Sequence, residues 1–215
     1  MPFIIAINGP SCAGKTYISN ILKSIAPDRI SILNYDCYCV DHGDLSPEEI
    51  KKINYDVPEA YDAELLTKHV NELKNNKPVE IPVYNFSKHR RDNITTHFEP
   101  NDIIIVEGIM VFQVASLMNG GYDVKVAVNA KEHTRYERRF ARDQIERGRT
   151  PESIEYQWNS TVQPSCEIYI DPLSKLADII LTNDRKDGKI KNIEKVEKVI
   201  KEVLGLWNIN TCSLI

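Results

Sequence analysis

A glycine-rich stretch close to the N-terminus carries the clearest chemical signal in the sequence. Its residues are Gly9-Pro10-Ser11-Cys12-Ala13-Gly14-Lys15-Thr16, which match the phosphate-loop pattern G-x-x-x-x-G-K-[ST]. The apolar run 3–7 comes before it, and a helix-like segment at about 15–25 begins at its end. This pattern binds phosphate where it joins a strand to a helix and surrounds the anion with backbone N–H groups, so the stretch predicts phosphate binding.

Four residues of this loop have separate expected roles. Gly9 and Gly14 can adopt backbone angles that are closed to other residues, which lets successive amides point inward. Lys15 is expected to reach the outer phosphates, and Thr16 to offer its hydroxyl to Mg²⁺. The alternative is a glycine turn with an unrelated lysine. At average residue frequencies, the four fixed positions arise by chance in fewer than roughly one such chain in a hundred, so phosphate binding is favoured.

Two carboxylates follow predicted strands that would end beside this loop. Asp36 follows the β-branched and aromatic segment 29–35, and Glu107 follows the apolar run 102–106. Ligands of open parallel sheets lie outside the carboxyl ends of the strands, so both side chains should reach the phosphate. Because Mg²⁺ prefers oxygen ligands, Thr16, Asp36 and Glu107 are predicted as its direct or water-mediated shell. The alternative for each carboxylate is to cap the turn after its strand.

A predicted helix at about 131–147 carries an unusual arginine pattern. Four of its arginines recur at i, i+3, i+4 and i+7 and should share one face. Like charges on one stripe repel each other unless an anion gathers them, so the pattern favours a lid, about 131–163, that closes over triphosphate. The alternative is a solvated basic face. The arginines concerned, with two that follow, are Arg135, Arg138, Arg139, Arg142, Arg147 and Arg149.

The remaining segments alternate between helix and strand patterns. Helices are predicted at about 46–53, 63–75, 151–163 and 192–204, and strands at 79–84, 94–98, 124–128 and 178–181. Pro82 suits an edge strand, so about 79–98 is expected to form a hairpin appended to the main sheet. The alternation predicts a single doubly wound α/β domain over residues 1–215. Five residues of the last helix are expected to face inward: Ile193, Val196, Ile200, Val203 and Leu204.

Bulk composition excludes several classes of partner. The net charge of −4 gives no general attraction to nucleic acid, so any anion binding must be local. The apolar run at the N-terminus stops at Asn8, which is too short for a signal peptide or a membrane span. The five cysteines have no framework spacing and suit a reducing compartment. We therefore expect a cytoplasmic protein that binds neither nucleic acid nor membrane.

Several stretches, taken in order and spacing, resemble the uridine/cytidine kinase family, within the wider group that includes phosphoribulokinase and pantothenate kinase. The likeness runs from about Ile4 to Ile180. Beyond the phosphate loop its stretches are Asp36-Cys37-Tyr38, Asn54-Tyr55-Asp56, Ile81-Pro82-Val83-Tyr84, His89, Val106-Glu107-Gly108-Ile109, Arg138-Arg139, and Arg142-Asp143 through Glu146-Arg147-Gly148-Arg149. The resemblance implies a P-loop NTPase three-layer sandwich with a mostly parallel sheet, an appended β-hairpin and an Arg-rich helical lid.

The same resemblance implies a reaction and a role for each matching residue. The reaction is Mg²⁺-dependent transfer of the ATP γ-phosphoryl group to the 5′-hydroxyl of uridine or cytidine in nucleotide salvage. Asp36 matches the general base, and Asp56 and Arg139 match residues that hold the ribose hydroxyls. The residues matching those that read the edge of the base are Tyr84, His89, Arg149 and Gln157, with Tyr55 and Phe86 as the aromatics around it. The residues matching those that act on the ATP phosphates are Lys15, Arg142 and Arg147.

The chain departs from the family pattern around the acceptor base and after the last strand. Cys39 stands where the family usually has a tyrosine, Asn85 replaces a common aspartate, and Asn129-Ala130 replaces an acidic pair. The stretch 182–185 also differs from the sequence that the family usually has after the last strand. Two alternatives stay open: a related P-loop kinase with a different small-molecule acceptor, and a nucleotide-binding switch or ATPase without an acceptor. The resemblance further suggests a homo-oligomer, and leaves open uridine or cytidine as acceptor and ATP or GTP as donor.

Overall fold

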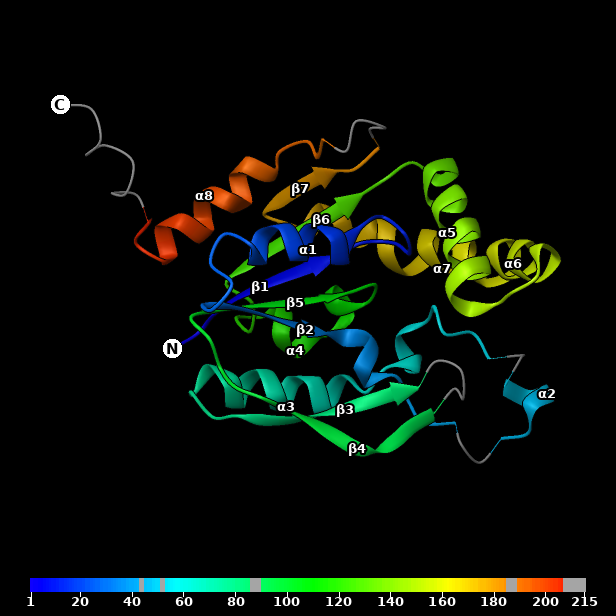
Figure 1. Ribbon diagram of the computed structural model, residues 1–215, viewed down its shortest axis with the longest axis horizontal. Coiled ribbons are helices and arrows are strands. Elements are labelled where there is room, and N and C mark those ends of the chain that lie inside the picture. The colour runs from blue at the N-terminus through cyan, green and yellow to red at the C-terminus, as the bar shows by residue number, and fades with distance from the viewer. Residues whose placement is uncertain (43–44, 51–52, 86–89, 185–188, 207–215) are drawn as a thin grey trace.

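A sheet of five parallel strands forms the centre of the molecule (Figure 1). The computed structural model describes residues 1–42, 45–50, 53–85, 90–184 and 189–206. The strand order is β2-β5-β1-β6-β7, so the phosphate-loop strand lies in the middle. The bounds are β1 Phe3–Asn8, β2 Ile30–Asn34, β5 Ile103–Gly108, β6 Val124–Asn129 and β7 Ile179–Thr182. The predicted parallel α/β sheet is therefore confirmed.

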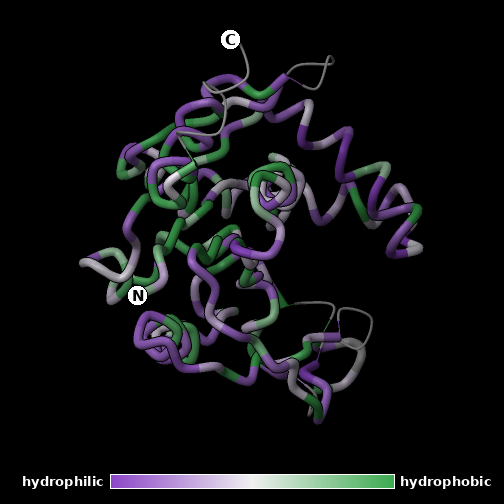
Figure 2. The backbone as a smooth tube through the Cα atoms, turned by 60° about the vertical axis from the view of Figure 1, so that its left-hand side comes forward, coloured by the Kyte–Doolittle hydropathy of each residue, from purple (hydrophilic) through white to green (hydrophobic). Residues whose placement is uncertain are grey.

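Alternating side chains along β1 divide the hydrophobic core between the two faces of this sheet. Ile5 and Ile7 share a cluster with α1 (Lys15–Lys23) and α8 (Ile193–Val203). Ile4 and Ala6 share the other cluster, which includes α3 (Ala63–Lys74) and the segment before α4 (Ala115–Met118). Figure 2 shows the hydrophobic residues concentrated along the central strands. Because helices cover both faces, the strands read as continuous apolar runs.

The last helix follows its predicted amphipathic pattern except at one position. Val196 and Ile200 are fully buried, and Ile193 packs partly buried against the same cluster. Val203 was predicted to face inward, but this prediction is wrong because the residue is 39% exposed at the end of the helix. Leu204, which follows the helix and is 6% exposed, is buried as predicted.

The predicted hairpin forms a two-stranded antiparallel sheet of its own. It consists of β3 (Val79–Asn85) and β4 (Arg90–Phe98), so β4 begins before the predicted residue 94. Pro82 lies beside a shift in the strand register, as expected for an edge strand. Arg91 of β4 donates to the carbonyls of Tyr38 at 3.0 Å and Cys39 at 2.9 Å. These bonds tie the hairpin to the segment that follows β2.

A helical arm lies at the end of the sheet where the strand carboxyl ends meet (Figure 1). It begins with α5 (Glu132–Arg147) and α6 (Pro151–Gln157), and continues through α7 (Gln163–Ser165). The helix predicted to end at 163 instead runs on through π-helical turns at Trp158–Val162 and Cys166–Ile170 to a 3₁₀ turn at Asp171–Leu176. Pro164 has no N–H to donate, and the wider turns on both sides accommodate it.

The short elements stay close to their predicted positions. The helix predicted at 46–53 is shorter, at α2 (Pro47–Ile50). A 3₁₀ turn at Tyr35–Tyr38, called η1 below, follows β2 directly and carries Asp36. Of the helices in the described ranges, none combines the length and apolarity that crossing a bilayer requires.

Candidate active site

The phosphate loop lies between β1 and α1, as its sequence predicts. Gly14 caps the N-terminus of α1 in a left-handed conformation, with φ of 97°. Within the loop, the other residue with a left-handed backbone is Cys12, with φ of 61°, and not Gly9 as predicted. Gly9 is required for space instead, because a Cβ there would collide with the carbonyl of Val128 on β6. Gly14 is thus needed for its backbone angle, and Gly9 for the close approach of β6.

Lys15, Thr16 and Glu107 come together at the floor of this loop. Thr16 Oγ1 donates to Glu107 Oε1 at 2.8 Å, and Lys15 Nζ donates to the carbonyl of Pro10 at 3.2 Å. Glu107 is only 2% exposed, so burial raises its pKa, while the charge of Lys15 opposes this effect. Burial likewise lowers the pKa of Lys15, opposed by Glu107 and Asp36. The two charges stabilise each other in a site with little water.

Asp36 faces the same site from the neighbouring strand end. β2 pairs with β5 so that Asn34 lies opposite Glu107, and Asp36 follows two residues later. The side chain of Asn34 accepts from the Asp36 N–H at 2.8 Å, which fixes the turn. The charge of Asp36 reaches both Lys15 and Glu107, since it shifts the pKa of each. The carboxylate therefore lies near both charges, at the strand end where the sequence predicts it.

The oxygen donors at this edge fit a magnesium ion bound together with phosphates. The described ranges contain no group of three or more His, Cys, Asp or Glu side chains that could hold a metal by themselves. The chain instead offers the hydroxyl of Thr16 and the carboxylates of Glu107 and Asp36. Mg²⁺ commonly binds one or two protein carboxylates and completes its shell with phosphate oxygens and water, so this partial donor set suits it.

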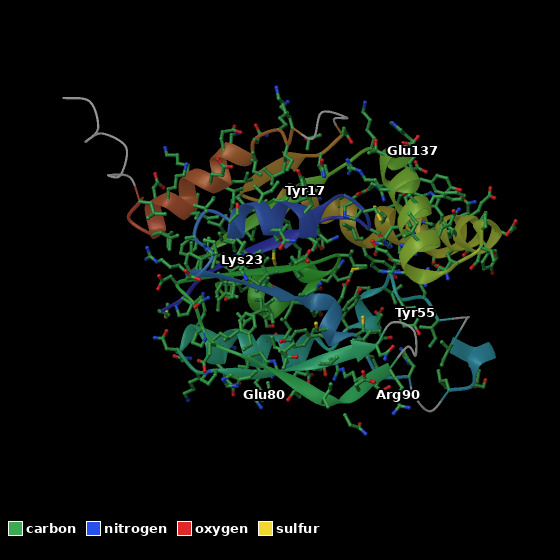
Figure 3. The ribbon with its side chains drawn as sticks, in the orientation of Figure 1. Tyr17, Lys23, Tyr55, Glu80, Arg90 and Glu137 are labelled. Carbon is green, nitrogen blue, oxygen red and sulfur yellow. The ribbon has the colours of Figure 1, made fainter. Side chains whose placement is uncertain are left out.

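The predicted nucleoside residues approach the site from the irregular segment before α3 and from β3. Tyr84 is 8% exposed and lies close to Tyr55, since each side chain shifts the pKa of the other. Burial raises the pKa of Asp56, an effect opposed by Arg139 and reinforced by Asp36. Asn54 accepts from the Asp56 N–H at 2.9 Å and anchors this segment to the helical arm. Figure 3 shows Tyr55 between the arm and the hairpin.

Three predicted residues of the arm contact one another, and one of them also contacts the phosphate loop. Arg139 donates to Ser11 Oγ at 3.0 Å and to Gln157 Oε1 at 3.5 Å. The guanidinium of Arg149 donates to the same oxygen of Gln157. Arg142 and Arg147 also lie close to these side chains, because Arg142 lowers the pKa of Arg149 and Arg149 lowers the pKa of Arg147. Phe86 and His89, which the resemblance assigns to the base, lie outside the described residues.

The predicted stripe of four arginines on one face is only partly correct. Arg135 is 3% exposed, stacks 5.3 Å from the Trp158 ring and donates to Gln163, so it packs inside the arm. An aromatic ring stabilises a guanidinium that is removed from water, which accounts for this orientation. Arg138 donates to the carbonyls of Cys12 at 3.4 Å and Asn183 at 2.9 Å. The other two, Arg139 and Arg142, are gathered by an anion that belongs to the chain itself. That anion is Asp143, whose side chain is fully buried.

The comparisons with known proteins agree with this geometry. The sequence model of the family described as "Phosphoribulokinase / Uridine kinase family" matches residues 4–187. The chain belongs to this family. It is 39% identical over 181 residues to a uridine kinase of Limosilactobacillus reuteri, covering 84% of this chain and 83% of the relative. It is 38% identical over 205 residues to a uridine kinase of Streptococcus pyogenes, covering 95% and 97%.

Solved structures support the fold of this family member. Phosphoribulokinase from Rhodobacter spheroides superposes with a TM-score of 0.61 at 14% identity, over 84% of this chain and 70% of that one. D-glycerate 3-kinase from Cryptococcus neoformans gives a TM-score of 0.65 at 15% identity, over 89% and 88%. At these identities the likeness concerns the fold, which is that of the P-loop kinases.

Sequence reasoning gave no role to several residues that shape this kinase site. Asn183 Nδ2 donates to the carbonyl of Ala13 at 2.8 Å and occupies the space beside Gly14. No local pattern could reveal a contact across 170 positions. Asp143 did leave a signal, because it lies four residues from both Arg139 and Arg147, the spacing of helical ion pairs.

The departure at Cys39 is accompanied by a tyrosine on the facing segment. Cys39 is 4% exposed and pairs with Tyr61 in an isolated antiparallel bridge. Burial raises the pKa of the Cys39 thiol and the Tyr61 side chain opposes this effect, while the Tyr61 ring stacks on Tyr35 at 4.7 Å. Asp36 and Asp56 both raise the pKa of Tyr61, after burial as the main cause. An aromatic side chain is therefore present beside Cys39, within reach of the charges of both carboxylates.

Proposed function

We propose that this chain transfers the γ-phosphoryl group of ATP to the 5′-hydroxyl of a pyrimidine nucleoside, uridine or cytidine. The observation that carries the proposal is the position of Asp36, a carboxylate whose charge acts both on Lys15 of the phosphate loop and on Asp56 of the segment before α3. Relatives 38–40% identical over most of the chain are uridine kinases, which supports the choice of acceptor.

The phosphate side stabilises the charge of the transferring group. In the proposal, backbone N–H groups of the loop surround the phosphates at the N-terminus of α1, and Lys15 neutralises their outer oxygens. Arg142 and Arg147 approach from the helical arm. Thr16, Glu107 and Asp36 hold Mg²⁺ directly or through water, and this ion supplies further charge neutralisation when bound. The arm excludes water, which would otherwise accept the phosphoryl group.

The acceptor side orients one hydroxyl and removes its proton. Asp36 accepts the proton of the 5′-hydroxyl as that oxygen attacks phosphorus, so a negative charge on Asp36 is required before transfer. Asp56 and Arg139 bind the ribose hydroxyls. Arg149, Gln157 and Tyr84 read the edge of the base, and Tyr55 contacts its face. Phe86 and His89 keep their predicted places in this pocket on the strength of the resemblance alone.

Location and assembly are part of the same proposal. We expect the enzyme to act in the cytoplasm, since its thiols at the described positions 12, 37, 39 and 166 are all free. The homo-oligomer that the family resemblance suggests stays a prediction, which the hydrodynamic mass in solution would test.

The test is phosphoryl transfer from ATP·Mg²⁺ to a panel of acceptors. The panel contains uridine, cytidine, adenosine, nicotinamide riboside, pantothenate and ribulose 5-phosphate, and both phosphorylated product and ATP loss are measured. We expect 5′-monophosphates of uridine or cytidine as the main products. Product from another acceptor would reassign the pocket, and ATP loss without product from any acceptor would contradict the proposal. Repeating the reaction with GTP decides the donor.

A further inference from the structure

One buried carboxylate lies at the centre of the arginine cluster on the arm. The side chain of Asp143 is fully buried, and four guanidiniums lie within ion-pair distance of it. The distances are 3.5 Å for Arg139, 2.7 Å for Arg142, 3.7 Å for Arg147 and 3.1 Å for Arg149. A single negative charge therefore holds four positive ones, which leaves the cluster strongly cationic.

The two oxygens of this carboxylate divide the arginines into two pairs. Oδ1 contacts Arg142 and Arg147, which the proposed function places on the triphosphate. Oδ2 contacts Arg139 and Arg149, which the proposed function places on the nucleoside. The nucleoside pair is joined a second time through Gln157, whose side-chain oxygen accepts from both arginines. Each oxygen of Asp143 thus contacts the two arginines that are proposed to bind the same ligand.

The backbone around Asp143 builds this arrangement. Arg139 and Arg147 lie one helical turn before and after it on α5, on the same face. Gly148 then takes a left-handed conformation, with φ of 60°, and ends the helix. This turn lets the N–H of Arg149 donate to the carbonyl of Asp143 at 3.0 Å, and its guanidinium returns to the carboxylate. Main chain and side chain of one residue therefore both position Arg149.

The electrostatics of the cluster make the carboxylate necessary. Although burial alone would raise the pKa of Asp143, the charges of Arg139, Arg142 and Arg147 lower it. Burial, and after it the neighbouring Arg142, lowers the pKa of Arg147, so the guanidiniums do repel one another. Without the negative charge, these side chains should separate and lose a common geometry.

We propose that Asp143 is a positioning residue that couples the nucleoside pocket to the triphosphate site. The inference rests on the proposed function. A nucleoside that fixes Arg139 and Arg149 also fixes the carboxylate between them, and this carboxylate holds Arg142 and Arg147 in place for the phosphates. The second ligand then meets arginines that are already ordered, so each ligand tightens the other.

The test is a binding cycle by titration calorimetry. Uridine affinity is measured with and without Mg²⁺ and the non-hydrolysable analogue β,γ-methylene-ATP, for the wild type and Asp143→Asn. We expect the analogue to tighten uridine binding about 5-fold or more in the wild type and less than about 2-fold in Asp143→Asn. The control is Glu137→Gln, which removes a carboxylate from the exposed outer side of the same helix (Figure 3) and should keep the coupling.

A second variant guards against loss of folding. Arg149→Lys keeps the charge balance of the cluster, but an ammonium cannot bridge Asp143 and Gln157 as the planar guanidinium does. It should also reduce the coupling below about 2-fold. Coupling that is absent in the wild type, or unchanged in both variants, would overturn the inference and leave the proposed function standing. A wild type that binds neither ligand would overturn the proposed function itself, and this inference with it.

Discussion

The phosphate side and the acceptor side of this site are built in different ways. The phosphate side is centred on eight consecutive residues, from the end of β1 to the first turn of α1, and its shape comes mainly from main-chain angles and from the close approach at Gly9. The acceptor side uses side chains from the segment before α3, from β3 and from the arm. Recognition of a phosphate therefore depends on local backbone, whereas recognition of an acceptor depends on how separate segments pack.

This difference indicates which side can change without loss of the other. The acceptor segments are joined to their neighbours by side-chain hydrogen bonds, such as that of Asn54 to Ser165 and those of Arg91 to Tyr38 and Cys39. The phosphate loop is held by the sheet, by α1 and by Asn183 together. Substitutions that move one acceptor segment should alter the choice of acceptor and leave phosphate binding intact. The departure at Cys39 falls on that adaptable side.

The largest expected effect comes from Lys15→Met on the phosphate side. Removing its charge should lower phosphoryl transfer about 10²–10³-fold, because a fixed cation no longer opposes the charge that develops on the phosphates. Initial rates of nucleoside monophosphate formation measure this. The matched control is Lys23→Met, which removes the same charge from the last turn of the same helix (Figure 3). Equal losses in the two variants would show that the effect is not specific to the loop.

A smaller effect is expected from Tyr84→Phe on the acceptor side. The change removes a hydroxyl that the proposed function places at the edge of the base, and it should raise the acceptor KM roughly fivefold, as one net hydrogen bond is worth about 1 kcal/mol. The KM for ATP should not change. Tyr17→Phe, at an exposed position on α1 (Figure 3), is the control. If both KM values rise together in Tyr84→Phe, the two sides are not separable in the way described.

The smallest effect is expected from Gly148→Ala at the turn that returns Arg149 to the cluster. The left-handed angle should cost about 1 kcal/mol of unfolding free energy, and the melting temperature should fall by roughly 2–4 °C. No atom lies within 4 Å of a Cβ at this position, so the cost is one of backbone angle alone. Gly148→Asn should lose less, because asparagine tolerates this angle. Equal losses for alanine and asparagine would contradict the explanation.

The same difference explains what could be predicted from the sequence. The phosphate loop, the apolar strands and the positions of Asp36 and Glu107 follow from local patterns and from the rule that parallel strands end at one edge. The structure confirms the strands and the strand ends at which these residues lie. The arginine stripe was predicted only in part, because the period of a helix does not reveal that Trp158 draws Arg135 inward.

Contacts between distant segments left no local pattern. Asn183 beside Ala13, and Tyr61 beside Cys39, depend on which segments the fold brings together. Asp143 is intermediate between these cases. Its spacing from Arg139 and Arg147 was visible in the sequence, but its contact with Arg149 depends on the turn at Gly148. Roles toward the ligands were predicted from the family resemblance and stay predictions.

The most direct test of a two-sided site is Asp36→Asn, assayed for product formation and for binding of β,γ-methylene-ATP. The substitution keeps the shape of the side chain and removes its ability to accept a proton. We expect uridine 5′-monophosphate formation to fall about 10²–10⁴-fold, while the dissociation constant of the analogue changes by less than about threefold. Near-normal turnover would contradict the role of Asp36 as general base. Loss of analogue binding in parallel with turnover would contradict the separation of the two sides.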